Sequence, residues 1–90
     1  MHRMRAARKY EVQMREIIPG VYHHFKGNDY EVIGVARHSE TEESFVVYRA
    51  LYGERGLWIR PLKMFQEYVD HNKYPDVDQE YRFEYVGASR

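Results

Sequence analysis

Two short histidine clusters are the first candidates for chemistry in this 90-residue chain. His23 and His24 are adjacent, and His38 is followed by Ser39 and Glu40. Adjacent residues of a strand point to opposite faces, so the first pair cannot readily share one metal ion. Sequence neighbours also rarely meet as nucleophile and base, which argues against catalysis at the second cluster. We therefore expect no metal, no cofactor and no catalytic group, and interpret the second cluster as a hydrogen-bonded loop.

Composition narrows the classes of function further. The chain has no cysteine, which excludes disulfides, thiol nucleophiles and thiolate metal ligands. The lack of disulfides in so small a domain favours the cytoplasm. No segment approaches the roughly 20 apolar residues that span a bilayer, and the basic N-terminus lacks the apolar run of a secretory signal. We expect no membrane partner.

The charge is unevenly distributed although the formal net charge is zero. Residues 1–15 carry five cations against one anion, whereas residues 16–90 carry nine cations against thirteen anions. The acidic balance of the larger part argues against general binding to duplex nucleic acid. Residues 1–16 are predicted to form a basic, flexible extension. Either residues 1–13 precede a natural start at Met14, or the tail binds nucleic acid while tyrosines stack on unpaired bases.

Short apolar runs separated by turn residues begin at residue 17 and predict strands. The expected strands, in chain order, are residues 21–25, 30–38, 44–52 and 57–60 and a fifth around residues 81–85, with a polar loop at 39–43 and a turn at 53–56. Leu62, Phe65 and Val69 recur at a helical spacing, which predicts a short helix within residues 62–70 that lies on the sheet.

These elements predict one mainly β domain over residues 17–90. Five short strands, tight turns and a single helical turn before the last strand are typical of a small SH3-like barrel. A strongly twisted antiparallel sheet with one short helix is the alternative architecture.

The turn lengths also predict the register of the central strands. A symmetric loop after the second strand places Gly34 opposite Tyr48, and the following turn places Arg49 opposite Arg60. One face of the sheet then has no charge and is the expected core: Tyr30, Val32, Gly34, Ala36, Val46, Tyr48, Ala50, Tyr52, Leu57 and Ile59. The other face gathers Glu31, Ile33, Val35, Arg37, Phe45, Val47, Arg49, Leu51, Trp58 and Arg60.

The second face combines arginines with the single tryptophan, a mixture typical of recognition surfaces. We interpret it as a binding module for an anionic group, either a protein carboxylate or a nucleotide phosphate. The candidate ligand-binding residues are Arg37, His38, Ser39, Glu40, Arg49, Trp58, Arg60 and His24. The competing interpretation is structural, with Glu31 and Arg49 forming a cross-strand ion pair. An accessory domain of an enzyme that uses His24 or His38 as a base is a further alternative.

Several short motifs together resemble one family. They are Pro19-Gly20-x-Tyr22-x-His24-Phe25-Lys26-Gly27, Tyr30-x-Val32, Ala36-Arg37-His38-Ser39-Glu40-Thr41, Val47-Tyr48-x-x-Leu51-Tyr52-Gly53 and Trp58-x-Arg60-Pro61-x-x-Met64-Phe65. Over about residues 17–86 the chain resembles a bacterial family catalogued as domain of unknown function 1653. The resemblance implies a small bacterial, cytoplasmic domain, and it implies no activity, cofactor or ligand. Residues 1–13 lie outside it.

Overall fold

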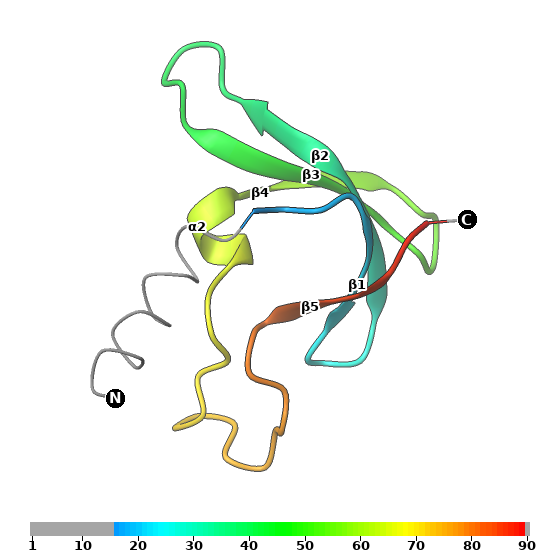
Figure 1. Ribbon diagram of the computed structural model, residues 1–90, viewed down its shortest axis with the longest axis vertical. Helices are drawn as coiled ribbons and strands as arrows, with labels where there is room; N and C mark the ends of the chain where they lie inside the picture. Colours follow the sequence, from blue (N-terminus) through cyan, green and yellow to red (C-terminus); the bar gives the residue numbers. More distant parts are fainter. Residues whose placement is uncertain (1–15, 90) are drawn as a thin grey trace.

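The computed structural model describes residues 16–89, which form one antiparallel sheet of five strands. The strands are β1 (Gly20–His24), β2 (Asp29–Arg37), β3 (Ser44–Ala50), β4 (Leu57–Pro61) and β5 (Phe83–Gly87), and the helix α2 (Leu62–Phe65) follows β4. Their order in the sheet is β4-β3-β2-β1-β5, so β4 and β5 are the edges (Figure 1). The mainly β fold is confirmed. The sheet is twisted and not closed into a barrel, because β4 and β5 do not pair. Of the two predicted architectures, the structure has the twisted antiparallel sheet with one short helix.

The basic extension predicted over residues 1–16 lies outside the described residues, except for Glu16. Within the described range, no helix has the length and apolarity needed to cross a membrane.

The core lies on one face of the twisted sheet, under α2. Its buried side chains are Tyr22, Val32, Val46, Tyr48, Phe65 and Phe83. The rings of Phe65 and Phe83 stack with centroids 4.2 Å apart, which joins α2 to the start of β5. The expected apolar side of the helix is confirmed, because Phe65 and Val69 are buried and Leu62 packs partly against the core.

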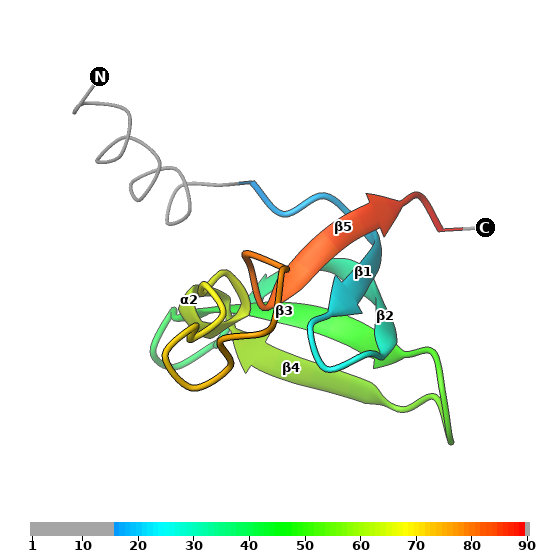
Figure 2. The ribbon, with the colours of Figure 1, turned by 90° about the horizontal axis from the view of Figure 1, so that it is seen from below.

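The helix is shorter than the predicted range and ends at Phe65. Tyr68 forms a β-bridge with Tyr81, and the N–H of Val69 donates to the carbonyl of Glu80. These pairings require an extended backbone where the spacing of apolar residues indicated a further helical turn. The segment after α2 therefore returns along the start of β5 (Figure 2).

The predicted register between β2 and β3 is wrong. Gly34 lies opposite Val47 rather than Tyr48, and a bulge between Val32 and Gly34 shifts the remaining pairs, so that Val32 lies opposite Tyr48. The one-residue shift also takes Gly34 and Ala36 off the expected core face, and Ala36 is exposed. The connection between the strands spans residues 38–43 rather than 39–43, and the N–H of His38 closes it by donating to the carbonyl of Glu43 at 2.8 Å. Both differences arise from local backbone choices that the apolar pattern does not specify.

The predicted register between β3 and β4 is wrong as well, and here the error exchanges the faces of the whole strand β4. Arg60 lies opposite Val46 rather than Arg49. The N–H of Ala50 already donates to the carbonyl of Gly56, so the strands separate at a longer turn than predicted. The offset is odd, and an odd shift moves every side chain of β4 to the other face.

Trp58 and Arg60 consequently share the face of the buried Val46 and Tyr48. Leu57 and Ile59, expected in the core, point the other way and are 56% and 61% exposed.

Candidate functional site

A hollow of about 570 Å³ lies where the sheet remains open. Both edge strands reach it, since Arg60 belongs to β4 and Phe83 begins β5. The β1–β2 turn and the segment after α2 complete its walls. Its lining is basic (His24, Lys26, Arg60, Lys73, Arg82), aromatic (Phe25, Tyr30, Tyr68, Tyr74, Phe83) and, at two positions, acidic (Glu67, Asp70). We refer to this hollow as the basic pocket.

Arg60 lies across the opening between the two edges of the sheet. Its guanidinium carbon is 5.5 Å from the centroid of the Phe83 ring, and its Nε donates to the hydroxyl of Tyr48 at 3.3 Å. A guanidinium over an aromatic face is attracted by the negative potential of that face. These two contacts orient the half-buried side chain, and no carboxylate among residues 16–89 forms an ion pair with it.

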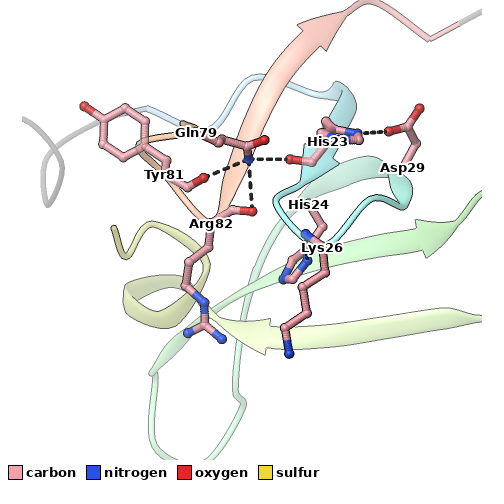
Figure 3. A network of polar contacts seen from close by, with 7 residues as sticks. All are labelled: His23, His24, Lys26, Asp29, Gln79, Tyr81 and Arg82. Atoms are coloured by element: carbon pink, nitrogen blue, oxygen red, sulfur yellow. Dashed lines mark hydrogen bonds and ion pairs between the residues drawn. The ribbon is translucent and has the colours of Figure 1, made fainter. Parts of the chain in front are cut away.

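Arg82 and Lys26 extend from the opposite wall of the pocket toward β4 (Figure 3). Arg82 forms an ion pair with Glu67, with 2.7 Å between Nη1 and Oε1. Lys26 holds its ammonium 5.9 Å from the ring centroid of Phe25 and 5.5 Å from that of Tyr74. Only one of these two cations is therefore paired with a carboxylate within the described part of the chain.

His24 is a neutral group inside this ring of cations. Its Nδ1 accepts a hydrogen bond from the backbone N–H of Lys26 at 3.1 Å, which leaves the proton of the neutral ring on Nε2. Burial, followed by the charges of Arg82, Arg60 and Lys26, lowers the pKa of His24 to about 4. At neutral pH this side chain is a hydrogen-bond donor without charge.

The tyrosines on the two sides of the pocket differ in their electrostatic environment. Lys26 is the main cause of a lowered pKa at Tyr74. Burial and a 2.8 Å hydrogen bond to the hydroxyl of Tyr52 raise the pKa of Tyr30 to about 12. Lys26 thus contributes to both lowered pKa values, after burial and the two arginines at His24 and as the main cause at Tyr74.

Gln79 holds the segment after α2 against β1. Its Nε2 donates to the backbone carbonyls of His23 at 3.0 Å, Tyr81 at 2.8 Å and Arg82 at 3.4 Å (Figure 3). The position of the Arg82 backbone is thereby tied to the strand that carries His24. Gln79 was not among the predicted site residues, since an amide in a polar loop gives no signal in one sequence.

The predicted residues Arg37, His38, Ser39 and Glu40 lie in the β2–β3 hairpin. The hairpin projects away from the β1–β2 turn and from the segment after α2 (Figure 1), and none of the four residues lines the pocket. Nδ1 of His38 accepts from the backbone N–H of Glu40 at 3.0 Å and of Thr41 at 3.3 Å. The interpretation as a hydrogen-bonded loop is confirmed.

The charges of this hairpin are only loosely paired. Arg37 is 3.8 Å from Glu42, and both side chains are largely exposed. A role of the hairpin in ligand binding stays a prediction.

Arg49 lies on the opposite face from Arg60, directly across from Glu31. Its guanidinium donates to the backbone carbonyl of Arg55 at 3.3 Å. The single surface expected to carry Arg49, Arg60 and Trp58 together therefore does not form. The structure brings His24 and Arg60 into one pocket and leaves Trp58 beside Arg60 on the same face of β4.

The part of the chain that is similar to known proteins contains the pocket. The family model described as "Protein of unknown function (DUF1653)" matches residues 20–85, which include every basic residue of the pocket. The chain belongs to the DUF1653 family. A crystal structure of a DUF1653 protein from Bordetella bronchiseptica is similar, with 39% sequence identity and a TM-score of 0.71. The similarity covers 86% of this chain and 96% of that one.

Among curated proteins, none matches this DUF1653 sequence. The resemblance seen in the short motifs is confirmed.

Proposed function

We propose that this DUF1653 domain is a binding module for an anionic group, which it holds in the basic pocket. The main support is the convergence of Lys26, Arg60, Lys73 and Arg82 on one hollow. Glu67 offsets Arg82, whereas Asp70 directs its Oδ1 toward the backbone N–H groups of its own turn. The remaining positive charge is available to a ligand.

The chemistry of the pocket suits a carboxylate or a phosphate. Arg60 and Arg82 offer planar forks of N–H donors, which match two oxygens of either group. Lys26 adds a point charge and His24 a neutral Nε2–H donor. The aromatic rings beside these groups lower the local polarity, which favours such interactions over those in bulk water.

Binding is better supported than catalysis. A histidine with a pKa of about 4 is a weak base at neutral pH, so His24 has little capacity to take up a proton from a substrate. The other histidine considered as a base, His38, uses Nδ1 to accept hydrogen bonds within its own loop.

A titration with inorganic phosphate followed by NMR tests this function. We expect saturable shifts in the amide signals of Lys26, Arg60 and Arg82. The variant Arg60→Gln should weaken binding by about ten- to a hundredfold, since a charge-assisted hydrogen bond contributes about 1.5–3 kcal/mol.

The matched control is Arg49→Gln, an arginine of the same sheet on the other face. Shifts that do not saturate, or equal losses in the two variants, would contradict an anion site in the pocket.

A further inference from the structure

Strand β4 has one edge that no described strand covers. The N–H of Ala50 donates to the carbonyl of Gly56, and backbone direction alternates along an antiparallel strand. Trp58 and Arg60 therefore direct their backbone groups toward β3. Leu57 and Ile59 direct their N–H and C=O groups outward, where they are available to another strand.

The side chains along this edge are unusually apolar for an exposed strand. Leu57, Trp58 and Ile59 are consecutive and are 56%, 59% and 61% exposed. An accessible edge of this kind is a template for the addition of a further strand. Pro61, which has no N–H, limits the ladder at the end next to α2.

We propose that an extended peptide with an acidic side chain adds as a strand to the free edge of β4 and places its carboxylate in the basic pocket. This inference rests on the proposed function and names the class of ligand. The residue of the added strand opposite Arg60 points to the pocket face, because directly opposed side chains share a face.

The same geometry predicts a sequence pattern in the peptide. The acidic residue lies beside Arg60, the next residue faces Ile59, and the one after it returns to the pocket face beside Trp58. Apolar or aromatic residues suit the last two positions. Backbone hydrogen bonds to β4 then supply affinity, while the pocket and Trp58 select the side chains.

Charge complementarity favours an acidic peptide over a second copy of this chain. β4 itself reads Leu57–Pro61, with Arg60 as its only charged residue. Pairing of two such edges brings no carboxylate to the pocket and leaves its cations without a counter-charge. An acidic strand supplies that charge.

The experiment is a selection of peptides from a random displayed library on the full chain, followed by amide hydrogen exchange. We expect the enriched peptides to carry an acidic residue two positions from an apolar one. At saturation they should slow exchange of the Leu57 and Ile59 amide protons. Arg60→Gln should weaken binding by about tenfold, as expected for a charged partner left unpaired.

Two lysine substitutions on edge strands form a matched pair. Ile59→Lys, at a position 61% exposed on β4, should weaken peptide binding by roughly tenfold. The variant loses an apolar contact, and a lysine on an edge strand disfavours pairing with another strand. Val86→Lys, at a position 59% exposed on β5, should leave peptide binding unchanged.

The outcomes separate the inference from the proposed function. Enriched peptides that leave Leu57 and Ile59 exchanging as in the free protein would overturn strand addition. If exchange of these amide protons slows with rising protein concentration and no peptide, a second copy of the chain occupies the edge, and the peptide proposal is overturned too. If no peptide is enriched and inorganic phosphate still binds, only this inference fails. If neither binds, both proposals fail.

Discussion

The pocket changes the protonation of one imidazole, that of His24. His24 is neutral at pH 7 because burial and the nearby cations Arg82, Arg60 and Lys26 lower its pKa to about 4. An anion bound among those cations offsets their effect on the imidazolium, while burial remains. The pKa of His24 therefore reports directly on whether the pocket is occupied.

We expect sulfate to raise the pKa of His24 from about 4 toward its ordinary value of 6.5. Binding is then coupled to proton uptake, so sulfate affinity should increase as pH falls below neutrality. An NMR titration of the ring protons, with sodium chloride at matched ionic strength as control, measures the shift. Equal pKa values in the two salts would show that sulfate does not enter the pocket.

The same histidine predicts a pH dependence of folding. In the unfolded chain His24 binds its proton near pH 6.5, whereas in the folded protein it does so only near pH 4. Between these values the unfolded state holds more protons, so the free energy of unfolding decreases as pH falls from about 6.5 to 4.

His24→Gln should flatten the part of this dependence that arises from the imidazole. Urea denaturation of both proteins at several pH values in that window provides the comparison. A variant whose stability changes with pH as steeply as that of the wild type would disprove the shifted pKa.

At the scale of elements, the pocket depends on how the segment after α2 is attached. One amide group, that of Gln79, donates to three backbone carbonyls and joins this segment to β1. Gln79→Glu keeps the shape of the side chain but replaces the donor with a carboxylate that faces the same carbonyls.

We expect Gln79→Glu to lower the free energy of unfolding by about 1–3 kcal/mol, the cost of leaving polar groups unsatisfied. Exchange of the Val69 amide proton, which is bonded to the Glu80 carbonyl, should accelerate because the segment loosens. The control is the substitution Asp78→Asn at the adjacent, exposed position, which replaces an acid with an amide. It should change the free energy of unfolding by less than about 0.5 kcal/mol. Similar effects of both changes would mean that Gln79 does not hold the segment.

The elements show how far one sequence leads. Short apolar runs between turn residues predict all five strands. The helical spacing that includes Phe65 and Val69 predicts which side chains after β4 pack on the sheet, and both are buried. Register is a different matter, because the point at which a polar turn closes is set by single hydrogen bonds such as that from Ala50 to Gly56. That one contact moves Arg60 from the expected outer face to the pocket.

The remaining cations of the pocket could not be predicted by spacing. Lys26, Lys73 and Arg82 come from a hairpin turn, a loop and the position just before the last strand. Only tertiary structure brings them together. Arg82 alternates with Tyr81 and Phe83, which predicts a position away from the core but not the carboxylate or the cavity that it meets.

At the scale of the whole molecule, the open sheet and the pocket are one feature. A closed barrel would pair β4 with β5, whereas here the guanidinium of Arg60 spans the gap to the Phe83 ring. An anion held by Arg60 on one side and by Arg82 and Lys26 on the other would link the two edges of the sheet. Ligand binding should therefore stabilise the fold as a whole.

We expect sulfate to raise the melting temperature of the wild type more than that of Arg60→Gln. At ten times the dissociation constant a ligand contributes about 1.4 kcal/mol, which is several degrees for a domain of this size. Sulfate also stabilises proteins generally by its exclusion from their surfaces, so only the difference between the two proteins measures binding. Equal melting shifts in wild type and Arg60→Gln would leave the gap between β4 and β5 as an opening in the sheet that no anion bridges.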